Sequence, residues 1–412
     1  MPNGRSFVGF GFGPIQSGLF LLEAFRSGNF QNLTVAEIDP GLVHALRSAG
    51  GSFQVNVATR EGLDTVEVHG VQVLDPTDSA DQPKLIEAIS QAHEMATALP
   101  SVETYDTGGP ASVARLIAEG IRRRPSQPRL IYAAENHRRA ARCLHEAIAR
   151  HLPPAELDSA QVVDTVIGKM SGLVTDPDQL RRWELAPMTP GATSAILVEA
   201  FNHILISRVT LAHLAPGIPA FQQKTNLLPF EDAKLFGHNA VHALIGYLAH
   251  AQGIRCMSEL ASQPGILDIA RRALLDESGA ALIARHGRTG DPLFTPAGFA
   301  EHADDLLERM LNPYLRDQVE RIIRDTQRKL AYDDRLIGTM RLALEEGIEP
   351  RNLASGAAAA ARHLLNSADS PGEQAIRDRL IGLWGNRIDA HAPLIIELIC
   401  NAKDRLPEIR NA

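Results

Sequence analysis

Strand-like patterns fill the first half of the chain and nearly vanish after Leu227. Up to that point, short apolar runs alternate with segments of helical periodicity, which is typical of strand–helix–strand units. Beyond it, five segments repeat apolar residues at helical spacing: 230–250, 264–285, 298–311, 334–346 and 352–365. A chain of this kind is expected to fold as an α/β domain followed by a mostly α-helical domain.

The length of the chain supports the same division. At 412 residues it exceeds what one hydrophobic core usually serves, so two domains are the default expectation. The proline- and glycine-rich stretch 216–219 is the best linker candidate. The predicted domains are therefore 1–219 and 220–412.

The composition excludes several classes of protein. With 44% hydrophobic and 22% charged residues the chain is an ordinary globular protein. A net charge of -8 offers no surface for nucleic acid, and no apolar run is long enough to predict a membrane partner. Three scattered cysteines (Cys143, Cys256 and Cys400) suggest reduced thiols. Without a signal-type N-terminal segment, a soluble cytoplasmic protein is expected.

A glycine turn near the N-terminus is the most specific local signal of the first half. Residues 6–10 suggest a buried strand, and an apolar-periodic helix follows the turn. Gly11 would permit the tight turn, and Gly13 would let backbone N–H groups approach a pyrophosphate at the helix N-terminus. Gln16 replaces the third glycine of the dinucleotide fingerprint, so an empty strand–helix turn is the alternative. The candidate cofactor contacts of this turn are Gly11, Phe12, Gly13, Pro14 and Ile15.

A second strand, 33–39, ends in acid at the distance from the glycines that a βαβ unit requires. Glu37 can accept both ribose hydroxyls of an adenosine and would repel a 2′-phosphate, which favours NAD over NADP. Asp39 is the neighbouring alternative, although Asp39-Pro40 is more typical of a helix N-cap. The turn and the acid together predict a Rossmann-type NAD-binding domain over 1–219.

The remaining strands of the first half place two more candidates. Strands are expected at 53–57 and 66–74 as an insertion, and then at 95–99, 129–134, 161–170, 183–187 and 195–200, with a helix at 201–212. Such sheets bind ligands outside the carboxyl ends of their strands. Thr97 is therefore a candidate cofactor contact, and Asn136 a candidate carboxamide donor. Capping of a helix that begins near Arg138 is an equally good interpretation of Asn136.

The candidate chemistry lies in the predicted helix 230–250. On an ideal α-helix, Asn239 lies about 140° and His242 about 80° round from Lys234. One broad face could thus offer an amine, a carboxamide and an imidazole, which suit taking a proton from a hydroxyl and holding its oxygen. A solvated lysine beside two polar capping residues is the alternative. His238 and His242 have metal-ligand spacing, but no further ligand pair accompanies them, so no metal is expected.

A local basic cluster follows in the helical half. It could bind a substrate phosphate or carboxylate, but the aspartates among its members make a salt-bridged surface an equally good interpretation. The cluster consists of Arg324, Arg328, Lys329 and Arg335.

These pieces resemble the long-chain polyol dehydrogenases over nearly the whole chain, closest to the mannitol-1-phosphate 5-dehydrogenases. Lys234-Leu-Phe with Asn239 and His242-Ala matches the catalytic helix of that family. Glu135-Asn136 resembles its Glu-Asn at the nicotinamide side, and Glu199-Ala-Phe resembles its Glu-x-Phe element. Further family strings follow in order: Asn312-Pro-Tyr-Leu, Val319-Glu-Arg, Arg328-Lys-Leu and Asp334-Arg-Leu.

The resemblance implies a metal-independent NAD(H) oxidoreductase that interconverts a secondary alcohol and a ketone on a polyol or sugar phosphate. Lys234 would be the general base, and its ordinary pKa near 10.4 would have to be lowered. Asn136 and Asn239 would donate to the substrate oxygen, and His242 would orient the substrate. Mannitol 1-phosphate and fructose 6-phosphate are the first pair to test. The expected substrate contacts are Lys169, Arg328, Lys329 and Arg335.

Three departures from the family keep alternatives open. Gln16 stands where the family has the third glycine of the fingerprint. The segment 166–173 lacks the family's polar groups, and Lys169 is a candidate to replace one of them. The segment 101–109 looks inserted beside the expected cofactor. A non-phosphorylated polyol or a sugar acid is therefore an alternative substrate. A catalytically silent NAD-binding regulator is the alternative from another class. In either case a monomer or small homo-oligomer with a small-molecule ligand is expected.

Overall fold

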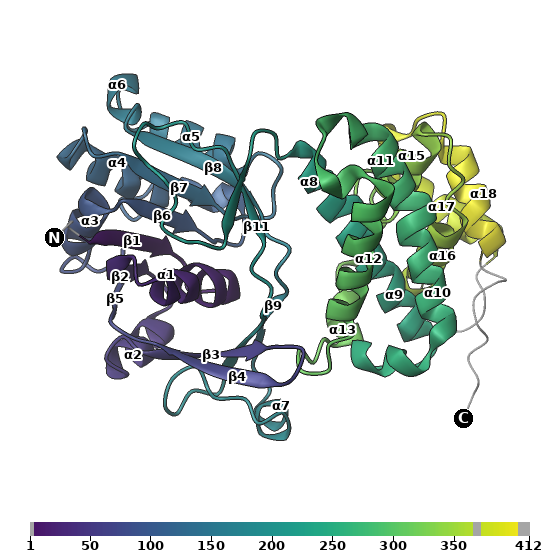
Figure 1. Ribbon diagram of the computed structural model, residues 1–412, viewed down its shortest axis with the longest axis horizontal. Helices are drawn as coiled ribbons and strands as arrows, with labels where there is room; N and C mark the ends of the chain where they lie inside the picture. Colours follow the sequence, from purple (N-terminus) through teal and green to yellow (C-terminus); the bar gives the residue numbers. More distant parts are fainter. Residues whose placement is uncertain (1–3, 366–371, 403–412) are drawn as a thin grey trace. The chain divides into compact units, whose positions relative to one another are not determined.

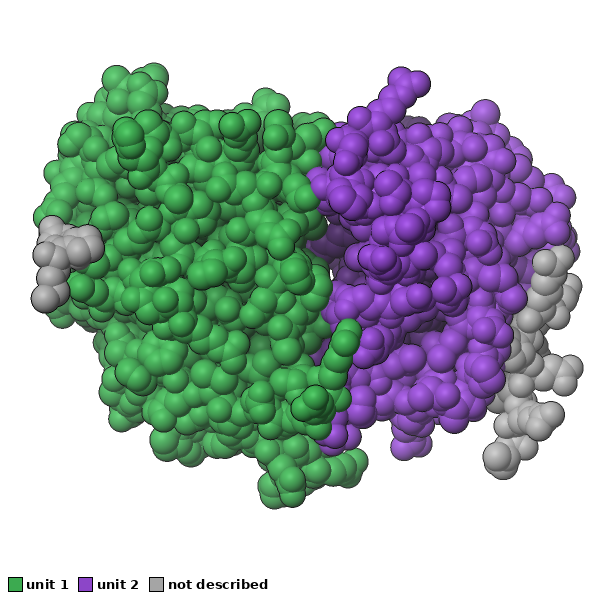
Figure 2. All heavy atoms as spheres, in the orientation of Figure 1, with its two compact units in different colours: residues 1–227 green, residues 228–412 purple. Residues whose placement is uncertain are grey.

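A computed structural model of the chain describes residues 4–365 and 372–402. The chain forms two compact units, Met1–Leu227 and Leu228–Ala412, which Figure 2 shows in different colours. The first is built on a mainly parallel sheet with helices, and the second is helical, so the predicted fold class is confirmed.

The first unit is organised by an eight-stranded sheet in the order β12-β11-β8-β7-β6-β1-β2-β5 (Figure 1). Its neighbouring strands pair in parallel except β8 and β11, which are antiparallel. Apolar runs form these strands because both faces of a parallel sheet are covered. The strands are β1 Arg5–Phe10, β2 Phe30–Ala36, β5 Val71–Leu74, β6 Glu94–Thr97, β7 Arg129–Ala133, β8 Ala160–Val166, β11 Ile204–Ser207 and β12 Phe221–Lys224.

Helices cover the two faces of this sheet. Alternate residues of β1 point to opposite faces, so Phe7 joins the core cluster of Phe20, whereas Val8 joins the cluster of Leu85 and Ile117. The first face carries η1 Gln16–Leu21 and α1 Leu22–Ser27, which form one helical run. The other helices of this unit are α2 Pro40–Ser48, α3 Gln82–Gln91, η2 Val102–Tyr105, α4 Val113–Arg123, α5 Ala140–Ala149, α6 Pro154–Leu157 and α7 Pro177–Arg182.

A second, four-stranded sheet has the order β4-β3-β10-β9. The predicted single strand 66–74 is wrong, because Gly70 adopts a φ of 75° and breaks it in two. Its first part belongs to β4 of this sheet, and its second part is β5 of the main sheet. The strands are β3 Phe53–Ala58, β4 Leu63–Val68, β9 Ser171–Val174 and β10 Ala195–Glu199.

Two other predicted elements are wrong. Residues 183–187 form no strand, since Glu184 adopts the left-handed conformation with a φ of 54° directly after α7. Residues 201–212 form no helix. They contain β11 instead, where Ile204 and Ile206 are buried at the period of two that a strand requires.

Each of the five helical segments predicted in the second half is helical in the structure. Helix α9 approaches α16 closely at Gly356, where the absence of a Cβ makes room, since a Cβ there would lie 2.8 Å from the Leu244 side chain. No helix in the described residues is long and apolar enough to cross a membrane. The principal helices are α8 Leu228–Asp232, η3 Ala233–His238, α9 Asn239–Ala251, α10 Pro264–Arg272, η5 Ala273–Gly279, α11 Ala280–His286, α12 Pro296–Met310, α13 Val319–Ile322, α14 Thr326–Lys329, α15 Ile337–Glu345, α16 Arg351–Leu364, α17 Glu373–Trp384 and α18 Ala392–Ala402.

Candidate active site

The glycine turn and the acid of the second strand meet at the carboxyl ends of β1 and β2. Gly11 adopts a φ of 81°, and its N–H donates to the carbonyl of Ala36 at 2.8 Å. The Glu37 carboxylate accepts from the Phe12 N–H at 2.7 Å and from two N–H groups of its own strand end. The Asp39 carboxylate caps α2 by accepting from the Leu42 N–H at 2.8 Å, as its Asp-Pro pair predicts.

Gln16 changes how the first helix packs on β1. A Cβ at Gly9 would lie only 2.1 Å from the Gln16 amide nitrogen, so a glycine on the strand provides the room that the third fingerprint glycine usually provides on the helix. Gln16 is fully buried, and neither atom of its amide has a hydrogen-bond partner among the described residues. A π-helical turn begins at the same residue.

The carboxyl ends of β6 and β7 meet at Glu135. The Thr97 hydroxyl donates to this buried carboxylate at 3.0 Å, and the Leu99 N–H does so at 2.9 Å. Asn136 follows as an exposed residue of the turn before α5. The N-cap position of α5 is Arg139, without a side-chain cap, so the capping interpretation of Asn136 is wrong.

Lys169 is held inside the first unit. It is buried, and its ammonium donates to the carbonyl of Phe201 at 3.1 Å and to the side-chain oxygen of Asn202 at 2.9 Å. Lys169, in the turn between β8 and β9, thus contacts the segment that follows β10.

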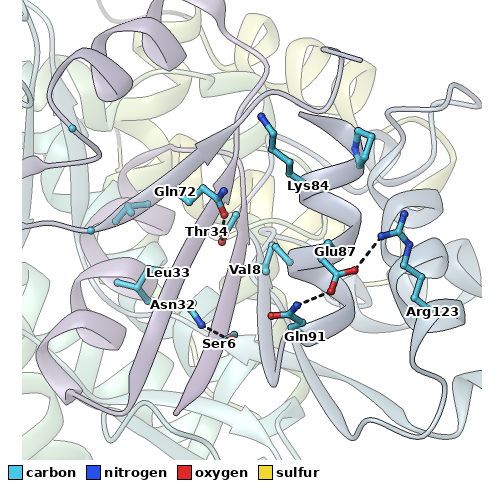
Figure 3. A pocket seen from close by; sticks show the side chains of 15 residues that line it. Ser6, Val8, Asn32, Leu33, Thr34, Gln72, Lys84, Glu87, Gln91 and Arg123 are labelled. Atoms are coloured by element: carbon cyan, nitrogen blue, oxygen red, sulfur yellow. Dashed lines mark hydrogen bonds and ion pairs between the residues drawn. The ribbon is translucent and has the colours of Figure 1, made fainter. Parts of the chain in front are cut away.

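Figure 3 shows a groove elsewhere on the first unit. Ser6, Asn32 and Gln72 lie along its floor, on the first halves of β1, β2 and β5, and Lys84 and Glu87 line it from α3. Nucleotides bind outside the carboxyl ends of parallel strands. This groove therefore lies away from the expected cofactor position.

Lys234, Asn239 and His242 share one helical run, but the run is not an ideal α-helix. The Asn239 N–H donates to the carbonyl of Lys234, five residues earlier, within the π-helical segment η3. Because five residues close this turn, Asn239 lies nearer to the Lys234 side of the helix than the angle of about 140° for an α-helix. The predicted angle of about 140° is therefore too large, and the Lys234 and Asn239 side chains lie closer to one face of the helix than predicted.

Side chains from two other helical runs hold the π segment. The Phe236 carbonyl accepts from the Ser278 hydroxyl at 2.7 Å and from the Thr339 hydroxyl at 3.3 Å. Ser278 itself lies in another π segment of the helical unit, η5. A Cβ at Gly338 would lie 2.9 Å from the Phe236 ring, so glycine lets the chain lie against it. The irregular turn is thus fixed by tertiary contacts.

The amine of Lys234 is adapted to proton transfer. Burial, and then the positive charge of Arg335, lower the pKa of Lys234 to about 8, while Glu231 acts in the opposite direction. The side chain is half-buried. An amine with this pKa is neutral in an appreciable fraction of molecules near neutral pH, as a general base must be.

His242 is oriented by an aspartate that spacing along the sequence did not reveal. Its Nε2 lies 2.9 Å from the Asp317 carboxylate, whose other oxygen accepts from Arg321 at 2.6 Å. Burial would raise the pKa of Asp317, but the bonds and charges of His242 and Arg321 outweigh it and hold the pKa below its ordinary value. Asp317 is 75 residues from His242, and no local motif links the two.

His238 lies between Lys234 and His242 on the same run, with ring centroids 6.1 Å from His242. Burial, and then the charges of His242, Arg309 and Lys234, hold the pKa of His238 well below its ordinary value, so its imidazole is neutral. Within residues 4–365 and 372–402, no group of three or more His, Cys, Asp or Glu side chains is arranged to hold a metal ion.

The basic cluster divides into two parts. Arg335 lowers the pKa of both Lys234 and Lys329, so its charge is close enough to interact with each of them. Lys329 is buried, and its ammonium donates to the Arg324 carbonyl. Arg328, in contrast, is exposed and pairs with Asp325 at 3.7 Å. Arg335 is also paired, with Asp334 at 2.7 Å, but its charge acts on Lys234 as well. The residues around Arg328 fit the salt-bridged surface of the alternative.

Comparisons with known proteins agree with this arrangement. Among solved structures, D-sorbitol dehydrogenase in substrate-free form matches with a TM-score of 0.76 and 12% identity, over 98% of this chain and 94% of that one. The Pseudomonas fluorescens mannitol 2-dehydrogenase ternary complex with NAD and D-mannitol matches with a TM-score of 0.70 and 14% identity, over 98% and 92%. The chain thus has the fold of these sorbitol and mannitol dehydrogenases.

The helical unit is matched more specifically. Residues 226–394 match the family described as the mannitol dehydrogenase C-terminal domain. The matched segment contains Lys234, Asn239 and His242. The helical unit thus resembles the C-terminal domain of that family, and the whole chain shares the fold of the two solved dehydrogenases.

Proposed function

We propose that the protein is an NAD(H)-dependent oxidoreductase that interconverts a secondary alcohol and a ketone on a polyol or sugar phosphate. One observation carries the proposal. Lys234, whose pKa is lowered to about 8, shares a π-helical turn with Asn239. His238 and His242 follow on the same helical run, and Asp317 orients His242. This set supplies a proton acceptor and amide and imidazole groups for a substrate oxygen.

Each residue has a defined part in the proposed reaction. The neutral Lys234 amine takes the hydroxyl proton of the alcohol, and Asn239 donates to the oxygen as it becomes a carbonyl. Asn136 would donate to the same oxygen, as the resemblance implies. His242, fixed by Asp317 at 2.9 Å, orients the substrate. NAD, held at the glycine turn of the first unit, would supply the acceptor for the hydride that leaves the same carbon.

The residues of the first unit fit the dinucleotide. A Cβ at Gly13 would meet no atom within 4 Å, so the turn leaves open space where a pyrophosphate would approach the backbone. Glu37 stands where a ribose would be held, and Ile38 beside it is 66% exposed, which offers an apolar surface for adenine. Phe12, Pro14, Ile15 and Thr97 would complete the contacts. The mannitol 2-dehydrogenase of similar fold was solved with NAD.

Fructose 6-phosphate and mannitol 1-phosphate are the first pair that we propose. Lys329, which is buried, and Arg335, whose charge acts on both Lys329 and Lys234, support an anionic substrate, because such cations favour a phosphate or carboxylate. Lys169 and Arg328 are weaker candidates, because Lys169 already donates to the Phe201 carbonyl and Arg328 is already paired with Asp325. A free polyol is the second candidate, and D-mannitol in the similar mannitol 2-dehydrogenase favours it.

A screen of NADH oxidation over ketose phosphates, free ketoses and keto acids tests this function. With the substrate found, Lys234→Ala should lower turnover about 10²- to 10⁴-fold, because a general base is lost. NADH binding, followed by fluorescence titration, should remain nearly intact. Lys84→Ala, at an exposed lysine on α3, is the control and should behave as the wild type. Near-normal turnover of Lys234→Ala would refute the assignment, and NADH binding without any turnover would favour a silent regulator.

A further inference from the structure

The Glu135 carboxylate collects three neutral donors at the carboxyl ends of β6 and β7. Thr97 and the Leu99 N–H donate to it at 3.0 and 2.9 Å, and the Tyr105 hydroxyl donates to the same oxygen as Thr97. Glu135 and Tyr105 are both buried, and Thr97 is fully buried. The carboxylate is therefore held in one position from two sides, by the end of β6 and by the segment that follows it.

Tyr105 is itself fixed, although it belongs to the segment that looked inserted in the sequence. The Ser112 hydroxyl donates to the Tyr105 carbonyl at 3.2 Å and lies 3.0 Å from an Asp106 oxygen. The other Asp106 oxygen accepts from Arg150 at 3.0 Å and lies 3.1 Å from His151. These contacts join the segment to the end of α5. Tyr105 can therefore act as a rigid donor.

The turn that carries Asn136 depends on Glu135. Strand β7 ends at Ala133 and α5 begins at Ala140, and residues 136–139 between them are exposed. The Ala134 N–H donates to the Thr97 carbonyl at 3.0 Å, and the His137 N–H donates to the Glu135 carbonyl at 2.7 Å. Asn136 thus lies between a side-chain anchor and a backbone bond that both involve Glu135.

We propose that Tyr105 and Glu135 are positioning residues for the reaction, which fix the backbone of Asn136 and so aim its carboxamide at the substrate oxygen. The proposal rests on the function proposed above. Its physical basis is that a carbonyl-binding donor must be held within a fraction of an ångström, and a displacement of about 1 Å can cost about 10²-fold in rate. The inserted segment would then contribute to catalysis without touching the substrate.

A second buried tyrosine–glutamate pair provides a matched control. The Tyr132 hydroxyl donates to Glu94 at 2.7 Å, and both residues are fully buried on the same two strands, β7 and β6. Arg5 and the Gly217 N–H share the Glu94 carboxylate, far from Asn136 in the chain. Loss of either tyrosine hydroxyl removes the same kind of bond. Only the loss of the Tyr105 hydroxyl should affect Asn136, the proposed donor to the substrate oxygen.

Steady-state kinetics compare Tyr105→Phe with Tyr132→Phe. We expect Tyr105→Phe to lower kcat about 10- to 100-fold while the Kd for NADH and the melting temperature change as little as in Tyr132→Phe. Glu135→Gln retains an oxygen that can accept from Tyr105 and should recover most of the kcat that Glu135→Ala loses. Equal kcat values in the two tyrosine variants would overturn the proposal.

Backbone amide exchange of residues 134–139 in the protein without ligands tests the same proposal independently of any substrate. Tyr105→Phe should raise the exchange rate of this segment severalfold, and Tyr132→Phe should leave it at the wild-type rate. Unchanged exchange in Tyr105→Phe would overturn the positioning role even if turnover were found. Faster exchange in a protein that oxidises no NADH would support the anchor and refute only the proposed function.

Discussion

The low pKa of Lys234 has two separable causes, burial and the nearby charge of Arg335. Burial penalises the charged amine wherever the side chain is enclosed, whereas Arg335 acts only through its own positive charge. A substitution that removes the charge should therefore change the pKa of Lys234 in a known direction.

The pH dependence of alcohol oxidation should report this pKa. The neutral amine is the active base, so kcat/KM for oxidation should rise about tenfold per pH unit below about 8 and level off above it. The ketone-reducing direction needs the protonated amine and should fall as the pH rises through the same value. Arg335→Gln should move the inflection upward, because the neighbouring charge that lowers the pKa of Lys234 is lost. Arg328→Gln is the control, and an inflection that stays in place in Arg335→Gln would contradict the assignment.

Glu37 should make the protein select NADH over NADPH. Its carboxylate lies at the end of β2 on the Phe12 N–H, where a 2′-phosphate would meet a like charge. We expect NADPH to bind about tenfold or more weaker than NADH, and Glu37→Ser to narrow the difference. Fluorescence titration with both cofactors measures it. Tighter binding of NADPH to the wild type would refute this role of Glu37.

Residues that share a local pattern could be predicted from the sequence, and residues that meet through packing could not. Lys234, Asn239 and His242 lie on one helical run, so their spacing could suggest them as candidates. Asp317 and Tyr105 lie 75 and 30 residues from the side chains that they contact. Only the folded chain brings them there, and no spacing rule describes these pairs.

At the scale of an element, periodicity predicted that the run 230–250 is helical but did not reveal its π turn. Apolar residues at helical spacing tolerate one additional residue, since tertiary contacts decide whether a turn closes over four residues or five. The same limit explains the segment 201–212. Its apolar residues suited a helix by spacing, yet Ile204 and Ile206 pair as a strand between β8 and β12.

Ser278 should stabilise the π turn of η3. Ser278→Ala removes the 2.7 Å bond to the Phe236 carbonyl and should lower the free energy of unfolding by about 1–2 kcal/mol. Because the turn sets Asn239 relative to Lys234, turnover should fall as well. Ser262→Ala is the control, since this serine also donates to a helix carbonyl, at 2.8 Å, but on the surface. Chemical denaturation and kcat together check the effect, and a Ser278→Ala variant equal to Ser262→Ala would contradict it.

At the scale of the whole molecule, the change of pattern after Leu227 predicted two units, because parallel sheets and helical bundles have different periodicities. The first compact unit ends at Leu227, beyond the predicted residue 219, because β12 still pairs with β11. A strand of four residues that begins with Phe221 carried too little pattern to be recognised.

Each unit carries one of the two tryptophans, which allows the units to be followed separately. Trp183 lies in the first unit, and Trp384 is buried in the second, where its indole N–H donates to the Leu330 carbonyl at 2.8 Å. NAD⁺ at about 100 times its Kd should stabilise the unit that binds it by about 2.7 kcal/mol. In Trp384→Phe, the unfolding transition reported by Trp183 fluorescence should therefore move to a higher denaturant concentration when NAD⁺ is added. In Trp183→Phe, the transition reported by Trp384 should move less. Equal shifts would contradict binding by the first unit.

The π turn at residues 233–238 also means that the relative orientation of the proposed catalytic side chains depends on how this turn closes. If the same residues closed as a regular α-helix, Asn239 and His242 would be rotated by up to about 100° relative to Lys234, because each residue of an α-helix turns by that angle. The chemical identity of every side chain and the number of residues between them would be unchanged. A chain could thus keep the lysine, the asparagine and the histidine at the same spacing and still lose the reaction, so the closure of the turn is as much a part of the motif as the residues themselves.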